Sequence, residues 1–298
     1  MKIHNDNEKI INWLDTHLLS NVDISKDYSM NSRKSLIPHF VMDRLRPEFL
    51  FQMNGLATTH LPESIRDIFC VTFLSEEVVE SICSAGIHEA LLITHHFFDM
   101  SCGDPGQTNG VPFHFINENS FKFLLNNNNA IYSCHLPMDR QECFFNTSKS
   151  FALSLGMNKF EPLELSALPN VGYYSKLSSI VPALDREIFP FIVHYGHNDP
   201  VGKEIPTAII AGVISNTEIL DELERQGIQR LLCGDVLVRI SSPRYEKMLD
   251  YLQKTSLSIY CFSHLLTERC ALKMLANELH NVFPQVNTHY SQEKTTWK

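Results

Sequence analysis

Short apolar segments alternate with amphipathic helical segments along most of the chain, and this alternation limits the possible fold classes. The apolar segments are rich in Ile, Leu, Val, Phe and Tyr and show little polar–apolar alternation. Such segments are typical of strands that are covered on both faces of a sheet. We predict strands at residues 67–73, 90–94, 129–134, 189–195, 208–214, 228–233 and 257–262.

Segments with helical periodicity lie between these predicted strands. Ser242 and Pro243 open one such segment as an N-cap and a proline at the first helical position. Strands that alternate with helices are typical of an α/β fold with mainly parallel or mixed sheets. We predict helices at residues 75–84, 146–155, 217–226, 242–253 and 264–283.

Polar, Gly- and Pro-rich stretches separate some of the elements. Residues 20–36, 99–114 and 196–206 are expected to be irregular, and the polar tail beyond Val286 is expected to fray. The first 36 residues carry an apolar helical face and are predicted to form an N-terminal helical extension.

Composition and short motifs exclude several classes of protein. The formal net charge of −9 argues against a nucleic-acid-binding surface, which needs clustered Lys and Arg. We expect no membrane span and a cytoplasmic location, because no apolar run approaches the required length and the N-terminus lacks a secretory pattern. The eight cysteines form no CxxC pair and are expected to be reduced thiols. No dinucleotide-binding, P-loop or nucleophile-elbow motif is present in the sequence.

Two adjacent histidines, His95 and His96, directly follow the predicted strand at 90–94. Functional groups of open α/β sheets gather where strands end, and imidazole is the commonest transition-metal ligand in proteins. Neighbouring residues of a strand point to opposite sides, so both rings reach one cavity only if the backbone is irregular there. The alternative is a histidine pair that merely ends the strand.

A second set of ligand-type residues follows the predicted strand at 129–134. His135 and Asp139 lie four residues apart, so a turn after the strand would bring both side chains to one point. The alternative is an aspartate that caps the next helix.

The third set opens the last predicted helix. His264 and Glu268 stand at positions i and i+4 and therefore share one face of its first turn. Two ligands at this spacing can bind one ion or bridge two. The alternative is an exposed polar face of the helix.

The three sets together predict a metal centre, because each stands at the end of a predicted strand. They offer more nitrogen and oxygen ligands than one tetrahedral zinc ion needs, and a carboxylate that bridges two ions accounts for the surplus. Mixed imidazole and carboxylate ligands suit Zn, Mn or Fe(II) better than Ca or Mg. We therefore expect two divalent transition-metal ions (Zn, Mn or Fe).

The order of these sets resembles the Nif-three-like family, the YbgI-type dinuclear metal-centre proteins, which are often labelled homologues of GTP cyclohydrolase type 2. The resemblance covers about residues 40–285. It rests on Ile93-Thr94-His95-His96, on His135 to Asp139 and on His264 to Glu268, with lesser matches at Asn54-Gly55-Leu56, at Asn146 with residues 151–156, and at Cys233-Gly234-Asp235.

The resemblance implies a role for each of these residues. The metal ligands would be His95, His96, Asp139, His264 and Glu268, with Glu268 bridging the two ions. His135 would stand near the ions, either as a direct ligand or as a neighbour of the ligands, and it is our candidate catalytic residue.

The resemblance also implies two linked α/β halves with mixed sheets flanked by helices, the second half inserted into the first, and a ring-shaped homo-hexamer. From this resemblance we expect three parts. They are the helical extension at 1–36, a metal-binding α/β domain at 37–160 plus 228–290, and an inserted α/β region at 161–227.

The function implied is that of a metal-dependent hydrolase or cyclohydrolase acting on a nucleotide-like substrate through a metal-activated water. His135 or His194 would move protons. The chain departs from the family pattern at Phe97, where the family usually has proline, and at Ser263 and Leu265, where it usually has glycine and tyrosine. These departures favour the alternative, a non-catalytic metal-binding protein that serves as a metal chaperone, an insertase or an adaptor.

Overall fold

The chain folds into two units, the second inserted into the first. The computed structural model describes residues 6–20, 23, 27–99, 115–168, 171–177, 193–198, 203–238 and 242–291. The first unit comprises Met1–Met100, Phe113–Phe145 and Leu272–Lys294, and the second comprises Ser101–Pro112, Asn146–Ala271 and Thr295–Lys298.

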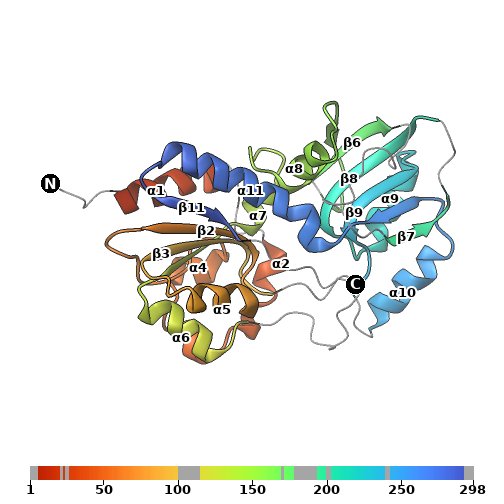
Figure 1. The fold of residues 1–298 in the computed structure, drawn as a ribbon. Helices are drawn as coiled ribbons and strands as arrows, with labels where there is room; N and C mark the ends of the chain where they lie inside the picture. The colour runs from red at the N-terminus through yellow and green to blue at the C-terminus, as the bar shows by residue number, and fades with distance from the viewer. Residues whose placement is uncertain are drawn as a thin grey trace. The chain divides into compact units, whose positions relative to one another are not determined.

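The first unit contains a mixed five-stranded sheet in the order β1-β4-β3-β2-β11 (Figure 1). Neighbouring strands from β4 to β11 are parallel, and β1 pairs antiparallel with β4. The strands are β1 (Gly55–Leu56), β2 (Asp67–Phe73), β3 (Ala90–His96), β4 (Ala130–Ser133) and β11 (Asn287–Tyr290).

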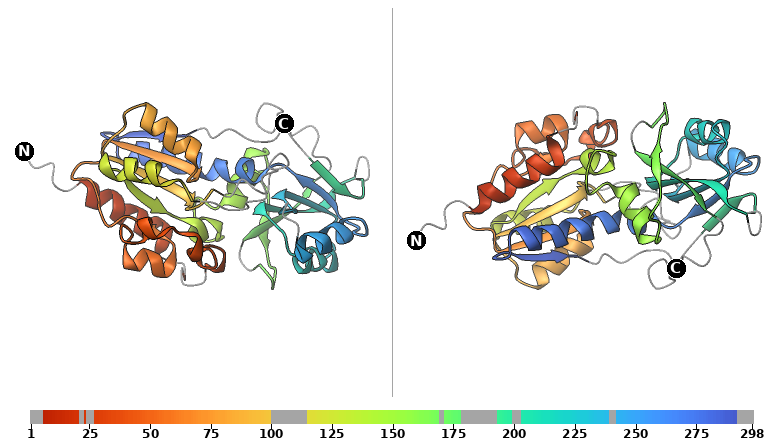
Figure 2. Two further views of the ribbon diagram at one scale, coloured as in Figure 1. Left: turned by 90° about the horizontal axis from the view of Figure 1, so that it is seen from below. Right: turned by 90° about the horizontal axis from the view of Figure 1, so that it is seen from above.

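Helices cover both faces of this first sheet, which is why its central strands are apolar on both sides. On one face lie α5 (Glu76–Ser84) and α6 (Glu118–Asn126). On the other lie α1 (Asp6–Leu14) and the part of α11 (His264–Val282) from Leu272 onward (Figures 1 and 2). Further short helices of this unit are η1 (Asp15–Leu19), α2 (Tyr28–Asn31), η3 (Lys34–Leu36), α3 (His39–Met42), α4 (Pro47–Gln52) and α7 (His135–Asp139).

The N-terminal helix belongs to the core of the first unit. Ile10 and Leu14 of α1 are fully buried. Just after α1, Asp15 accepts a hydrogen bond of 2.8 Å from the hydroxyl group of Tyr132 on β4. At the other end of the chain the expectation of a frayed tail is wrong, because residues 287–290 pair with β2 as β11.

The second unit contains a mixed six-stranded sheet in the order β5-β6-β8-β9-β10-β7. Its three central strands β8, β9 and β10 are parallel, and the others pair antiparallel. The strands are β5 (Glu161–Leu163), β6 (Gly172–Leu177), β7 (Val193–Gly196), β8 (Ile205–Val213), β9 (Arg230–Asp235) and β10 (Ser258–Cys261).

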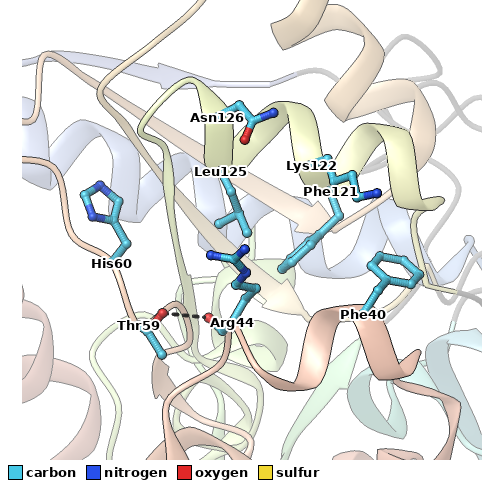
Figure 3. Close-up of a pocket in the computed structure, with 8 residues that line it drawn as sticks. All are labelled: Phe40, Arg44, Thr59, His60, Phe121, Lys122, Leu125 and Asn126. Carbon is cyan, nitrogen blue, oxygen red and sulfur yellow. Dashed lines mark hydrogen bonds between the residues drawn. The ribbon is translucent and has the colours of Figure 1, made fainter.

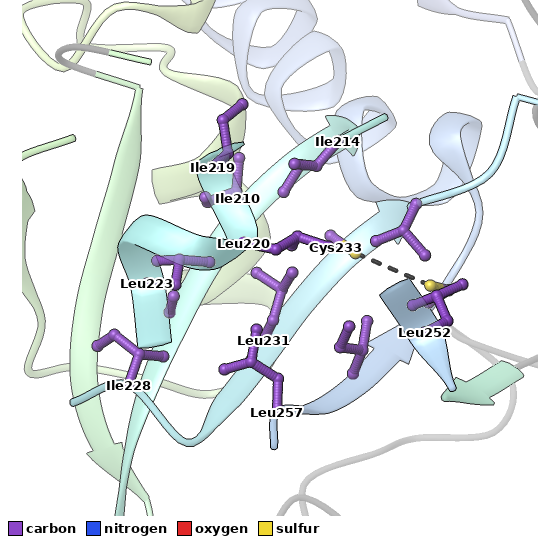
Figure 4. Packing of buried hydrophobic residues seen from close by; sticks show 14 of the residues in the cluster. Ile210, Ile214, Ile219, Leu220, Leu223, Ile228, Leu231, Cys233, Leu252 and Leu257 are labelled. Atoms are coloured by element: carbon purple, nitrogen blue, oxygen red, sulfur yellow. Dashed lines mark hydrogen bonds between the residues drawn. The ribbon is translucent and has the colours of Figure 1, made fainter. Parts of the chain in front are cut away.

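Alternation along the central strands divides the core of the second unit into two layers. Leu231 of β9 packs with Leu220 of α9 (Thr217–Arg225) and Leu252 of α10 (Pro243–Leu252) (Figure 4). The next residue along β9 points to the opposite face. There Leu232 packs with Phe151 of α8 (Thr147–Ser154), with Ile209 and with Phe262.

The predicted α/β class with two mixed sheets flanked by helices is confirmed. The observed bounds of the halves differ from the expected ones, because β9 and β10 pair with β8 and β7 in the second sheet. The chain therefore divides at Asn146 and Ala271. Residues 189–192 of one predicted strand, and residues 100–114 of the predicted irregular segment 99–114, lie outside the described residues.

Two further expectations concern cysteines and membranes. Every cysteine in the described ranges is a free thiol, and Cys233 and Cys261 lie with their sulfur atoms 3.8 Å apart between neighbouring strands (Figure 4). None of the described helices combines the length and the apolar character needed to cross a bilayer.

Candidate metal centre

The end of β3 brings two neighbouring imidazoles together. β3 extends through His95 and His96, which are 0% and 1% exposed. The Thr94 hydroxyl donates a hydrogen bond of 2.6 Å to the His96 carbonyl, two residues further along the chain. The ring centroids of His95 and His96 lie 4.4 Å apart, so the two side chains do not diverge to opposite sides of the sheet.

The single turn of α7 adds an imidazole and a carboxylate to this group. His135 Nε2 lies 3.5 Å from Asp139 Oδ2, and His95 Nε2 lies 3.4 Å from Asp139 Oδ1. The His135 ring centroid is 5.0 Å from that of His95 and 4.7 Å from that of His96. Ligand nitrogens of the three histidines lie within 4.8 Å of one another, so these residues could hold a metal ion.

The separations within this group fit a bound transition metal. A tetrahedral ion holds nitrogen and oxygen ligands at about 2.0–2.2 Å, which sets neighbouring ligand atoms about 3.3–3.6 Å apart. The two imidazole–carboxylate distances of 3.4 Å and 3.5 Å fall in this range. Each oxygen of Asp139 faces a different imidazole, and the donor set suits Zn, Mn or Fe(II).

Asp27 is a further member of the group that the sequence did not single out, because it falls in a segment expected to be irregular. It is 1% exposed, and its Oδ2 lies 3.0 Å from His135 Nδ1. Burial tends to raise the pKa of Asp27, but His135, Met30 and Asn54 hold that pKa well below its usual range. Asp27 is therefore ionised at neutral pH.

The second unit carries the other two predicted ligands on the first turn of α11. His264 Nε2 lies 3.0 Å from Glu268 Oε1, and both residues are buried. The helix is capped by Ser263, whose Oγ accepts a hydrogen bond of 3.2 Å from the Leu266 N–H. Ser263 has a φ of +107°, a conformation that glycine adopts more readily.

Two glycines let this turn of α11 approach the neighbouring strands. Gly212 has a φ of +78° and lies in a β-bulge between β8 and β9. A Cβ atom there would lie 2.7 Å from Glu268 Oε1. A Cβ atom on Gly234 would lie 2.8 Å from the His264 Cα atom. The small-residue turn at Cys233-Gly234-Asp235 was expected from the sequence, whereas the role of Gly212 was not.

His194, the other histidine considered for proton transfer, lies on the edge strand β7. Its Nε2 is 3.1 Å from both the Ser258 hydroxyl and the His197 carbonyl. These contacts give it a local role at the edge of the second sheet.

Comparison with known proteins assigns the family. The sequence profile of Duf34/NIF3 (NGG1p interacting factor 3) matches residues 50–296. The chain belongs to the Duf34/NIF3 family. The sequence matches no curated protein.

Solved structures share the Duf34/NIF3 fold over nearly the whole chain. Protein ybgI, of unknown function, is similar at 17% identity and a TM-score of 0.63, covering 97% of this chain and 99% of its own. Reduced HcgD from Methanocaldococcus jannaschii is similar at 14% identity and a TM-score of 0.59, covering 94% and 95%. A Bacillus cereus protein related to NIF3 is similar at 12% identity and a TM-score of 0.59, covering 97% of each chain. At such identities the likeness concerns the fold.

The Duf34/NIF3 chain also has a cavity of about 310 Å³ in its first unit, beside α6 (Figure 3). It is lined by aromatic and basic side chains, among them Phe121, Arg44 and Lys122. Lys122 is paired with Glu118 at 2.5 Å, and the Arg44 side chain is exposed. The cavity lining contains a single imidazole, His60, and no carboxylate, so the histidine group at the end of β3 is the better candidate for a metal centre.

Replacement of Gly212 by alanine should disturb the His264–Glu268 pair of this Duf34/NIF3 protein. We expect a loss of unfolding free energy well above the roughly 1 kcal/mol of a left-handed backbone alone, because the new methyl group collides with Glu268. Chemical denaturation followed by circular dichroism measures the loss. Gly227→Ala is the matched control, since Gly227 shares the φ of +78° but has open space around it. Equal losses in both variants would contradict the close approach.

Replacement of Ser263 by glycine should stabilise the protein by about 1 kcal/mol. Relief of a strained backbone is worth about 1–3 kcal/mol, whereas a serine N-cap replaced by glycine costs a few tenths. Ser75→Gly serves as the control, because Ser75 caps α5 in the same way with an ordinary φ of −105°. The same denaturation experiment would count against strain at Ser263 if both variants were destabilised equally.

Proposed function

We propose that this chain binds two divalent transition-metal ions (Zn, Mn or Fe) and hydrolyses a nucleotide-like substrate. The residues that would hold the ions are His95, His96, Asp139, His264 and Glu268, and the resemblance gives Glu268 the bridging role. The observation that carries the proposal is the group at the end of β3, where His95 Nε2 and Asp139 Oδ1 lie 3.4 Å apart, a separation that suits two ligands of one ion.

Each residue contributes a distinct part of the proposed chemistry. The two ions would lower the pKa of a bound water and hold a polar substrate. Asp139 presents one oxygen to His95 and the other to His135, so its carboxylate is oriented for ligation. His135 acts as the catalytic residue that moves a proton between water and substrate.

Family membership supports joining the two sets of ligands. Both sets lie within the residues matched to Duf34/NIF3, and both occur in the order seen in the resemblance to dinuclear metal-centre proteins. The His264–Glu268 pair is buried in the second unit with its atoms 3.0 Å apart, as expected for two ligands on one face of a helix. The nucleotide-like substrate, the cytoplasmic location and the ring-shaped hexamer are proposed from the resemblance alone.

A non-catalytic metal-binding role is the second candidate, as a metal chaperone, an insertase or an adaptor. It is favoured by the closed surroundings of the histidine group. Phe97 and Phe98 follow His96 and are both fully buried. Phe97 packs on Phe49 with ring centroids 4.8 Å apart. Closed, fully ligated sites are typical of structural metals, whereas catalytic sites keep a position open for water.

The metal centre can be tested by elemental analysis. We expect about two transition-metal ions per purified chain. His96→Ala and Glu268→Gln should each lose metal, because each removes a proposed ligand. His194→Ala is the control and should retain the wild-type content, since His194 contacts only the edge of the second sheet in the part of the chain described. A wild-type chain that stays metal-free after incubation with Zn, Mn and Fe(II) would refute the proposed centre.

Turnover separates the two candidate functions. The metal-loaded protein should hydrolyse at least one member of a panel of nucleotides and phosphoesters. His135→Ala should lower that rate about 10²–10⁴-fold while the chain keeps its metal, because it removes the proton-transfer group and none of the proposed ligands. A fully loaded wild-type protein that turns over none of the panel would favour the chaperone or adaptor role.

A further inference from the structure

Asp27 lies outside the segment that the family profile matches, yet it contacts the centre of the candidate site. The match begins at residue 50, and Asp27 reaches His135 across 108 positions of sequence. A buried carboxylate beside a buried imidazole calls for an explanation, because burying a charge is costly unless it is paired. The hydrogen-bond partners of the Asp27 carboxylate indicate its role.

Within the part of the chain that the structure describes, the Asp27 side chain contacts two hydrogen-bond donors and His135. Oδ1 accepts a hydrogen bond of 2.9 Å from the Met30 N–H, which is the contact of an N-cap residue with the third residue of α2. Oδ2 accepts a hydrogen bond of 3.0 Å from Asn54 Nδ2 and lies 3.0 Å from His135 Nδ1. Because an ionised carboxylate only accepts, His135 Nδ1 must carry a proton and donate it.

We propose that Asp27 is a positioning residue that holds His135 in the Nδ1–H tautomer, with an unprotonated Nε2 facing Asp139. The inference rests on the proposed metal centre and adds a residue that controls it. Carboxylates commonly accept the N–H of imidazoles beside metal ions, and they thereby fix the tautomer and the orientation of the ring.

The other side of the His135 ring shows why the tautomer matters. Nε2 lies 3.5 Å from Asp139 Oδ2, and in the Nδ1–H tautomer neither of these atoms has a proton to donate. Asp139 Oδ2 is then available to a metal ion. In the opposite tautomer the Nε2–H would donate to Asp139 Oδ2 and compete with the ion for that oxygen. Asp27 therefore prevents His135 from competing with a metal ion for Asp139 Oδ2.

The tautomer can be measured directly in metal-free protein. Long-range ¹H–¹⁵N correlation spectra of histidine-labelled protein at about pH 9, where imidazoles are neutral, distinguish the two ring nitrogens. The signals of His135 are assigned by their loss in His135→Gln. In the wild-type chain we expect a protonated Nδ1 and an unprotonated Nε2. A wild-type His135 that carries its proton on Nε2 would overturn the proposal without any Asp27 variant.

Asp27→Asn should reverse the tautomer and leave the fold intact. The amide oxygen can still accept from the Met30 N–H, and the amide nitrogen then faces His135 Nδ1 as a donor, which moves the ring proton to Nε2. Asn54→Ala is the matched control, because it removes the other partner of Oδ2 but leaves the Asp27 carboxylate. An unchanged tautomer in Asp27→Asn would mean that Asp27 only caps α2, and the proposal would be wrong.

Zinc affinity, measured by competition with a chromophoric chelator, links the tautomer to the metal centre. Asp27→Asn should weaken binding about 10- to 100-fold. Combining it with His135→Ala should abolish most of this loss, because no Nε2–H then competes for Asp139. A loss that persists in the double variant would contradict the positioning role. If the wild-type chain binds no zinc, the proposed function fails, and the tautomer spectra alone decide the role of Asp27.

Discussion

Buried polar side chains must be paired, and this constraint shapes the candidate residues of each unit. At the end of β3, His95 and His96 are buried, as are Phe97 and Phe98, which follow them. Asp139 offers one oxygen to each of two imidazoles at 3.4 Å and 3.5 Å. These distances are long for hydrogen bonds, and the 3.4 Å between His95 and Asp139 suits two ligands of a common ion.

In the second unit, the backbone geometry allows two buried polar side chains to pair with each other. Glu268 and His264 pair at 3.0 Å on a helix turn that sits against the ends of β8 and β9. This close approach depends on two residues without side chains, Gly212 and Gly234, and on a strained Ser263 that begins the helix. Strain of this kind is typical of functional sites, where surrounding structure holds a residue in a conformation it would otherwise avoid.

The central strands and the candidate residues at their ends could be predicted from the sequence because both depend on local pattern. β2 spans residues 67–73 as predicted, and the apolar residues of β9 alternate between two cores that helices cover. The ligand-type residues stand at strand ends, where α/β folds gather their functional groups. The short strands β1, β5 and β11 were not predicted, because an edge strand of a few residues carries no periodic signal of its own.

Contacts between residues that are distant in sequence could not be predicted from local sequence patterns. β9 pairs with β8 and β10 pairs with β9 in the second sheet, so the chain divides at Asn146 and Ala271, since strand order is set by tertiary packing. The positive φ of Gly212 follows from a bulge that only the observed register reveals. Asp27 was missed for the same reason, because its partners His135 and Asn54 are distant in sequence.

The position of Asp27 separates two kinds of residue in the site. The proposed ligands all lie within the residues matched to the family, whereas Asp27 precedes them on a segment tied to the first unit through Asn54. A carboxylate that fixes an imidazole can be supplied from any segment that reaches it, because only its distance and charge matter to the ring. A residue outside the matched segment can therefore bear on the proposed ligands, and Asp27 does so through its contact with His135.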